Sequence, residues 1–477
     1  MNGLQFEKHR AEFELLTPVH IGTGEELDPF SYVIRDGSLH FIDLVKWMES
    51  YEDQETLLRM TDTDNFAVLR SFVAENVSIE KAGMGSVKVE SHKLLKTYEK
   101  AIKERDPQNQ VLVGPMMRNF VTGQAYIPGS SVKGAIRTAL ANPCVGPARV
   151  RKGDRDASEK IFGRIKDDPM RWLKIPDISL GPDATVIVEP VEVSNKPDKS
   201  PTPKGHVEAA HALATGRPNK RSAVLSLAPF PLHGNTVDAQ YLLDALNDFY
   251  VHKYVQEALR FYNAGPVARV GKILEPVNCI VKNLASNEAI LRVGRFSHVE
   301  CMTLDDVRAP KTRMKNGRPM PFGTTRTLAN QLFPFGWIKV RFPALPLKDK
   351  KPYPWPNNLA ASENAPVQKL SAAAAPGQAG ASPQAPTKTG EAAKSAMSRI
   401  PPTQVKETSR LEPLLKQLTL LKPNDKVGMD RMIDALERLS EVQDKTALGN
   451  AIIAKLKKAG MWKKHPRKLD VLSNMDD

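Results

Sequence analysis

Hydrophobic and polar positions follow strand-like and then helix-like patterns in the first part of the chain. Residues 11–16 alternate in the strand sense, and residues 31–35 and 39–42 flank Asp36-Gly37, a dipeptide typical of a tight hairpin turn. Apolar residues then recur at helical spacing between residues 43 and about 103. The order of strand, hairpin and helix predicts a ferredoxin-like unit with insertions.

A second series of elements follows residue 220. Residues 223–228 read as a strand, residues 237–262 as a long amphipathic helix, and residues 290–293 and 337–342 as two further strands. This order resembles a second ferredoxin-like half. The sequence therefore predicts an α+β fold of two tandem ferredoxin-like, or RRM-like, domains with insertions.

Composition changes near residue 346. The next sixty or so residues are rich in Ala, Pro, Ser, Gly and Gln and hold few large apolar side chains, so they cannot bury a core and are predicted to be a disordered linker. Helical periodicity returns beyond the linker and predicts a small appended helical domain. The expected parts are a first domain with a helical insertion, a second domain, the linker and the helical domain, at residues 1–220, 221–345, 346–405 and 406–477.

A polar segment separates the strand-like residues 185–193 from the second series of elements. Residues 194–221 are rich in Pro, Lys, Asn and Ser, which predicts a long exposed loop. Its composition is equally compatible with a mobile loop and with a segment that lies along a ligand.

The charge of the chain favours an anionic partner. The 477 residues carry a formal net charge of +14. Residues 1–110 hold 13 Lys and Arg against 20 Asp and Glu, a net charge of −7, which leaves +21 for the remainder. We interpret the acidic first part as protein-facing or solvated, and the basic remainder as the side that faces a polyanion such as RNA.

Cysteine spacing and hydropathy exclude several classes of protein. Cys144, Cys279 and Cys301 are far apart and form no Cys-x-x-Cys motif, and the close pair of His298 and Cys301 has no second pair to complete a metal site. We therefore expect no disulfide, no metal and no other cofactor. The polar N-terminus lacks a signal-peptide core, and no apolar run approaches a membrane span, so we expect a cytoplasmic protein without membrane contact.

The strongest local motif is the stretch Gln124-Ala125-Tyr126-Ile127-Pro128-Gly129-Ser130-Ser131-Val132-Lys133-Gly134-Ala135-Ile136-Arg137-Thr138-Ala139-Leu140. A strand end runs through a proline and a glycine into two serines, either of which is a suitable N-cap for the helix that follows. The first turn of a helix presents unpaired N–H groups to an anion such as phosphate. Lys133 and Arg137, four residues apart, repel one another unless an anion lies between them. The alternative is an ordinary capped helix with two solvated cations.

Three ordered segments resemble the RAMP superfamily of CRISPR-associated RNA-binding proteins over roughly residues 8–345. The stretch Pro-Gly-Ser-Ser-Val-Lys-Gly-Ala-Ile-Arg-Thr-Ala-Leu at 128–140 resembles the signature of that superfamily. Residues 13–24 resemble its opening strand and glycine-bearing turn, and residues 291–298, with 323–327 and 334–337, resemble its C-terminal glycine-rich loop and final strand. Within the superfamily, the chain is most similar to the end-cap subunits of type III-A, or Csm, effector complexes. This similarity rests on Thr-Pro-Val-His-Ile-Gly-Thr-Gly at 17–24 together with Arg-Val-Gly-Arg-Phe-Ser-His at 292–298 and Pro-Phe-Gly-Trp at 334–337.

The resemblance implies a non-catalytic subunit that caps the 3′ end of the crRNA and contacts the last backbone subunit. It also implies a role in crRNA maturation and antiviral defence, with host nucleases as further candidate partners and target RNA contacted only indirectly. Binding through phosphates implies little sequence preference and strong salt dependence. The candidate RNA-binding residues, taken from the three segments, are His20, Gly22, Gly24, Gly129, Ser130, Ser131, Lys133, Arg137, Gly294, Arg295 and Arg326.

Two other functions remain open at this stage. One is a RAMP endoribonuclease that processes precursor RNA or cuts target RNA, for which His20 is the best acid–base candidate and Asp154 or Asp156 the nearest cleavage aspartate. A structural histidine and surface salt bridges are the simpler interpretations of these residues, and the chain has no Walker loop, His-Glu-x-x-His or Gly-x-Ser-x-Gly motif, so we assign no catalytic residue. The other is a backbone subunit of another type III complex, present in several copies.

Overall fold

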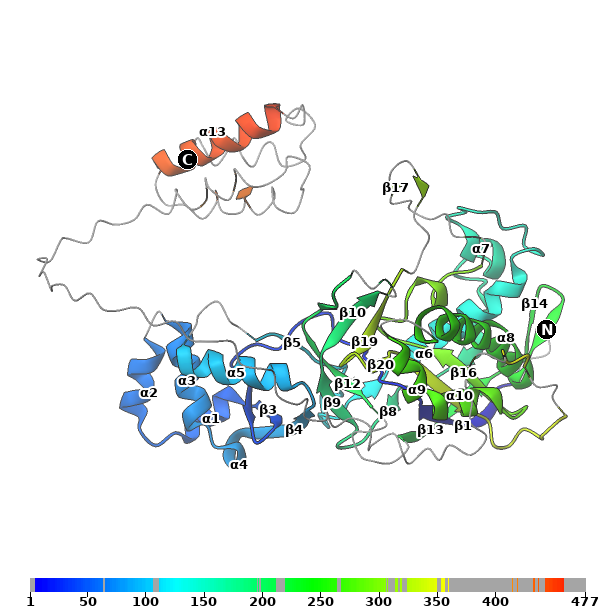
Figure 1. Cartoon of the computed structure of the whole chain (residues 1–477), viewed down its shortest axis with the longest axis horizontal. Helices are drawn as coiled ribbons and strands as arrows, with labels where there is room; N and C mark the ends of the chain where they lie inside the picture. The colour runs from blue at the N-terminus through cyan, green and yellow to red at the C-terminus, as the bar shows by residue number, and fades with distance from the viewer. Residues whose placement is uncertain are drawn as a thin grey trace, which may run out of the picture. The chain divides into compact units, whose positions relative to one another are not determined.

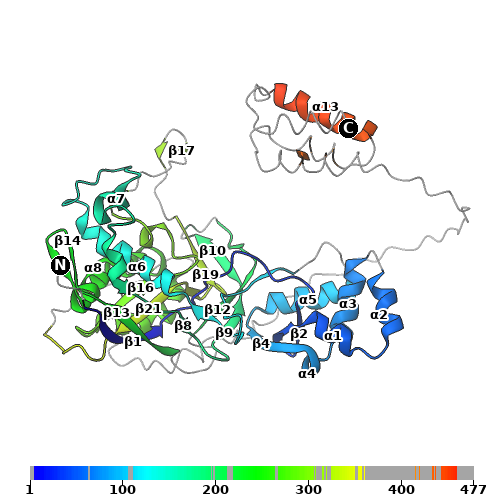
Figure 2. The same ribbon diagram turned by 180° about the vertical axis from the view of Figure 1, so that it is seen from behind.

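A computed structural model of the chain forms a mixed α+β fold with several sheets, drawn from opposite sides in Figures 1 and 2. It divides into two compact units, Met1–Ala379 and Gly380–Asp477. The described residues are 5–62, 65–105, 111–194, 196, 199–211, 219–263, 267–305, 307, 314–315, 318–319, 324–349, 353–356, 359, 414, 418, 432–433, 436 and 442–458.

A five-stranded antiparallel sheet forms the centre of the first unit. In spatial order its strands are β16 (Glu288–Arg292), β21 (Trp337–Arg341), β1 (Glu7–Leu15), β13 (Lys220–Leu227) and β7 (Leu173–Lys174). Phe13 and Leu15 on β1 are buried, as their alternation predicts. Because β1 lies between β13 and β21, the two predicted halves on either side of residue 220 share this one sheet, and their separation into two domains stays a prediction.

Helices α6 (Gly129–Ala141) and α8 (Ala239–Glu257) cover this sheet. They pack against each other and against β16, and their apolar side chains belong to the largest core cluster. A five-residue π-helical turn, Ala258–Tyr262, continues α8. The remaining helical elements around this core are η1 (Asn142–Cys144), α7 (Ala157–Phe162), η2 (Pro169–Trp172), α9 (Ala268–Ile273), α10 (Glu275–Lys282) and η5 (Val299–Cys301).

A six-stranded sheet carries the helical insertion. Its strands are β2 (Tyr32–Arg35), β3 (Ser38–Ile42), β4 (Gly83–Val89), β9 (Thr185–Val188), β12 (His206–Ala210) and β5 (Val113–Gly114). The insertion comprises α1 (Leu44–Ser50), α2 (Gln54–Thr61), α3 (Phe66–Asn76), α4 (Ile79–Ala82) and α5 (His92–Glu104), which gather beside β2–β4 in both views (Figures 1 and 2). Asp36 and Gly37 both have positive φ, which confirms the predicted hairpin.

Two sequence-based expectations about this sheet are wrong. Strand β4 interrupts the region expected to be helical, because only Val87 and Val89 signal it and its first four residues are exposed. Residues 206–210, inside the expected exposed loop, form the buried strand β12 between β9 and β5. The fully buried Glu208 breaks the apolar run that would have marked this strand.

Smaller sheets complete the first unit. A four-stranded sheet has the order β11 (Thr202–Pro203), β10 (Pro190–Ser194), β19 (Thr325–Ala329) and β20 (Phe333–Pro334). The two-stranded pairs are β6 (Tyr126–Ile127) with β8 (Ile178–Ser179), β14 (Phe230–Leu232) with β15 (Asn235–Val237), and β17 (Met314–Lys315) with β18 (Arg318–Pro319).

The second unit contains helix α13 (Val442–Lys458), inside the range 406–477 predicted to be helical. Its buried side chains Leu448, Ile452 and Leu456 pack with Leu418 and Ile433. Most of the predicted linker lies outside the described residues, so the linker and the helical domain stay predictions. No helix within the described part of the chain is long and apolar enough to span a membrane.

Candidate nucleic-acid interface

The three motif segments are joined by consecutive backbone hydrogen bonds. The N–H of Arg295 donates to the carbonyl oxygen of His20 at 2.9 Å, and the N–H of Met117 donates to that of Ile21 at 2.8 Å. The N–H of Tyr126, at the strand that leads into α6, donates to the carbonyl oxygen of Met117 at 3.0 Å. The opening motif therefore lies between the C-terminal loop and the segment that leads to the signature helix.

We call the place where these three segments are hydrogen-bonded the junction. The buried side chain of His20 stabilises it. Its side chain is 1% exposed, and its Nδ1 lies 2.6 Å from the carbonyl oxygen of Glu208. Burial lowers the pKa of His20, so the imidazole is neutral near pH 7. A Cβ atom on Gly22 would lie 2.8 Å from the His20 ring, and one on Gly294, whose φ is +85°, would lie 2.5 Å from its carbonyl oxygen. These two glycines permit the close approach, whereas Gly24 is exposed with open space around it.

Glu208 is a central residue of the junction that sequence reasoning missed. Its carboxylate accepts hydrogen bonds from the N–H of Met116 at 2.9 Å, from the Thr185 hydroxyl at 2.6 Å and from the Arg118 guanidinium. Arg118 also donates to the carbonyl oxygen of Gly123 at 2.6 Å, which ties down the turn between them. The only sequence signal was a lone acidic residue in an otherwise apolar stretch, His-Val-Glu-Ala-Ala.

The helix start differs from the expected serine cap. Helix α6 begins at Gly129, and no serine side chain caps it; the Asp177 carboxylate instead accepts a hydrogen bond from the Gly129 N–H at 2.9 Å. A Cβ atom at Gly129 would lie 2.1 Å from the carbonyl oxygen of Ile175, so glycine is required by this approach. Ser130 is exposed and Ser131 half-buried. The expected anion at this helix start is therefore supplied in part by the protein itself.

An internal carboxylate also accompanies the two cations of α6. Arg137 donates to Asp168 at 2.6 Å and to the Ser158 hydroxyl at 2.9 Å, and its guanidinium lies 3.8 Å from the centre of the Phe162 ring. Lys133 is half-buried, and desolvation lowers its pKa while the nearby Asp168 opposes that shift. Asp168 thus relieves the repulsion that the sequence attributes to the pair, and Lys133 remains the more available cation.

A family model described as the RAMP superfamily matches residues 12–269, over half of the chain. The chain belongs to the RAMP superfamily. The CRISPR system Cms protein Csm5 of Methanocaldococcus jannaschii is 30% identical over 128 residues, 26% of this chain. The match spans only 28% of that relative's length. These matches confirm the resemblance to the RAMP superfamily and to type III-A Csm proteins that the sequence motifs predict.

Two solved structures are more distant. A chain of the cryo-EM structure of a Csm–crRNA–target RNA ternary complex of a type III-A system is 21% identical, with a TM-score of 0.49, over 70% of this RAMP chain and 100% of its own length. The crystal structure of T. onnurineus Csm5 is 18% identical, with a TM-score of 0.42, over 69% of this chain and 99% of its own. Likenesses this remote do not bear on function.

The C-terminal motif of this RAMP protein contains one buried and one exposed arginine. Arg326 is 4% exposed and forms ion pairs with Glu257 at 2.7 Å and Glu300 at 3.1 Å, and Glu257 also pairs with the buried Arg292. RNA contact by Arg326 stays a prediction that would require this network to open. Arg295 is exposed and lies 5.1 Å from the centre of the Phe296 ring, so it presents a cation at the junction itself.

The aspartates considered as cleavage residues are engaged in local pairing. Asp154 accepts from the Arg151 N–H at 2.8 Å and from Lys160 at 2.7 Å, and both contacts lower its pKa, the first more than the second. Asp156 lies 4.0 Å from Lys160. Within the described part of this RAMP chain, no group of three or more His, Cys, Asp and Glu side chains is arranged to hold a metal ion, and the three cysteines are free.

Proposed function

We propose that this chain is a Csm5-like subunit of a type III-A CRISPR effector complex and that it binds the crRNA without cleaving it. Membership of the RAMP superfamily and the match to Csm5 support this assignment. The observation that carries it is the junction in which the opening motif, the signature segment and the C-terminal loop are joined by consecutive backbone hydrogen bonds. An RNA strand laid across this junction would meet all three motifs at once.

The contacts at this junction would be made mainly with phosphates. Arg295 offers an exposed guanidinium, Lys133 a half-buried ammonium group and Ser130 an exposed hydroxyl. Contacts of these groups with phosphates carry no sequence information, so binding through them should depend on salt and have little sequence preference. Gly22, Gly129 and Gly294 act indirectly, because each allows a close backbone approach that shapes the junction.

A binding role suits the chemistry of the candidate catalytic residues. General acid–base cleavage needs an accessible imidazole that titrates near neutral pH. His20 is buried, its pKa is lowered, and its Nδ1 is engaged by a backbone carbonyl group. Asp154 is held by Lys160 and by a backbone N–H.

The finer proposal concerns position in the complex. We place the subunit at the 3′ end of the crRNA, in contact with the last backbone subunit, where it would help set the mature RNA end and recruit host nucleases. Target RNA would be contacted only indirectly. The tandem ferredoxin-like halves of the family would supply the surfaces for crRNA and for the neighbouring subunit.

Native mass spectrometry of the complex that copurifies with the chain tests this proposal, with and without ribonuclease treatment. One copy per complex, bound with one short RNA and several paralogous subunits, is the expected result. Several copies per RNA would favour a backbone subunit. An RNA-free monomer that cleaves added RNA, with cleavage lost in His20→Ala or Asp154→Ala, would overturn the non-catalytic assignment.

A further inference from the structure

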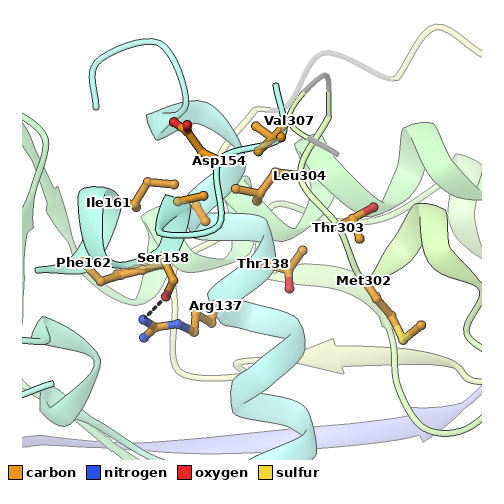
Figure 3. A pocket seen from close by; sticks show the side chains of 13 residues that line it. Arg137, Thr138, Asp154, Ser158, Ile161, Phe162, Met302, Thr303, Leu304 and Val307 are labelled. Carbon is orange, nitrogen blue, oxygen red and sulfur yellow. Dashed lines mark hydrogen bonds between the residues drawn. The ribbon is translucent and has the colours of Figure 1, made fainter. Parts of the chain in front are cut away.

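A cavity of about 420 Å³ lies beside the signature helix (Figure 3). Three segments border it: the C-terminal part of α6, the residues before and within α7, and the loop that follows η5. Ile161, Phe162 and Leu304 contribute apolar walls, and Met302, 58% exposed, adds a flexible apolar side chain. Its volume falls at the lower end of the range of about 300–1,000 Å³ that is usual for small-molecule sites, so it suits a single compact group.

Polar groups are placed at the edges of this apolar space. The Ser158 hydroxyl accepts from Arg137, which leaves its own O–H free to donate, and the Thr138 hydroxyl donates to the Gly134 carbonyl group, which leaves its oxygen free to accept. Arg137 stacks on Phe162, so a flat cationic surface also borders the cavity. Apolar walls with separate donors and acceptors at the rim match a flat heteroaromatic ring with polar edges.

The surroundings of the cavity carry the charge that a nucleotide chain requires. Residues 149–171 hold eight Lys and Arg against five Asp and Glu. Arg151, Lys152 and Arg155, just before α7, are all exposed. An apolar side chain of a protein partner would fill the cavity but would not call for this cationic border, whereas a base carries phosphates on both sides.

We propose that this cavity receives one unstacked nucleobase of a bound single-stranded RNA, with the neighbouring phosphates against Arg151, Lys152 and Arg155. The inference rests on the proposed RNA-binding function and adds a base-sized site to the phosphate contacts of the junction. Such a site would anchor one nucleotide of the strand with little dependence on sequence, because every base has an aromatic face.

The test measures binding of a short fluorescein-labelled single-stranded RNA to the full chain by fluorescence anisotropy, across a series of salt concentrations. Ala157→Trp places a large side chain in the cavity from a half-buried lining position. Ile165→Trp is the matched control, because Ile165 is 98% exposed, does not line the cavity and is also uncharged. Circular dichroism checks that each variant is folded.

Loss of one base contact should weaken binding by Ala157→Trp roughly 5- to 150-fold. The dependence of affinity on salt should stay the same, because no phosphate contact is removed. Ile165→Trp should bind like the wild type. Should Ala157→Trp fail to fold, the paired variant Thr138→Val and Ser158→Ala removes both rim hydroxyls at nearly constant volume and should weaken binding by a smaller factor.

The outcomes separate this inference from the proposed function. If the wild type binds RNA in a salt-dependent way and Ala157→Trp binds it with equal affinity, the proposed base site is overturned, whereas the proposed RNA-binding function is not. A folded Ala157→Trp that keeps RNA but loses a copurifying subunit also overturns it, because the cavity then serves a protein partner. A change in the salt slope would assign the effect to phosphate contacts instead. No binding of RNA by the wild type would overturn the proposed function together with the inference.

Discussion

Removal of the Glu208 carboxylate should destabilise the first unit more than removal of any surface carboxylate. Glu208 is fully buried, and two of its three donors are also buried, since Met116 is 1% and Thr185 is 7% exposed. In Glu208→Ala these two donors lose their acceptor, at a cost of about 1–3 kcal/mol each, or roughly 2–6 kcal/mol together. The Arg118 side chain is 26% exposed and can be rehydrated, so it adds little.

Thermal unfolding followed by circular dichroism measures this effect. At about 2 °C per kcal/mol for a chain of this size, the transition of the first unit should fall by roughly 4–12 °C. Glu192→Ala is the matched control, because Glu192 lies on the neighbouring sheet and its ion pair among the described residues, with Lys204, is at the surface, where such pairs contribute about 0–1 kcal/mol. A melting temperature of Glu208→Ala equal to that of Glu192→Ala would refute the assignment of Glu208 as the internal support of the junction.

Three further perturbations follow from charge and packing. Lys133→Glu and Arg295→Glu should each weaken RNA binding and flatten the plot of log affinity against log salt; an unchanged slope in the folded double variant would contradict the interface. Burial lowers the pKa of His211 to about 3, so the unfolded chain alone takes up this proton below about pH 6.5. Stability, measured by urea unfolding, should therefore fall by up to about 1.4 kcal/mol per pH unit between pH 6.5 and 3, and His211→Asn should reduce that fall. Deletion of residues 380–477 should leave the melting temperature of the first unit unchanged. Deletion of residues 346–477 should lower that melting temperature, because the longer deletion also removes Leu359, a 5% exposed side chain in the main core. Equal melting temperatures of the two deletion variants would contradict the packing of Leu359.

Short sequence patterns predicted the hairpin at residues 31–42 and strand β1, because the residues that form each of them are adjacent in the chain. Asp36-Gly37 determines its hairpin through two positive φ angles, and the alternation along residues 11–16 gives the inward side of β1. The three motif segments carry glycines at fixed positions, and Gly22, Gly129 and Gly294 among them permit close approaches. For the hairpin and for β1, the residues that cause the structure are neighbours in the sequence, whereas Gly129 and Gly294 approach Ile175 and His20, which lie far away along the chain.

Side-chain partners far apart in sequence were not predictable in this way. Asp177 replaces the serine cap from 48 residues away, and Asp168 meets Arg137 across 31 residues. Glu208 accepts a hydrogen bond from Met116, 92 residues away, and its charged side chain interrupts the apolar pattern by which strand β12 could have been predicted. Composition marks an acidic side chain as a surface group by default, so a buried acceptor of several donors is visible only once the fold brings the donors together.

Internal pairing also changes the meaning of the basic composition. A formal charge of +14 counts every arginine equally, but Arg137 and Arg326 are paired with carboxylates of the same chain. Of the four cations among the candidate RNA-binding residues, Lys133 and Arg295 are the two with no ion pair to a described carboxylate. Each phosphate contact on a single strand contributes a salt slope of about −0.7, so these two cations account for a slope of about −1.4, against about −2.8 if all four met phosphates. The decrease in the slope of log affinity against log salt in the double variant of Lys133 and Arg295 thus measures how many of these cations contact RNA phosphates. The remaining cations form ion pairs within the protein.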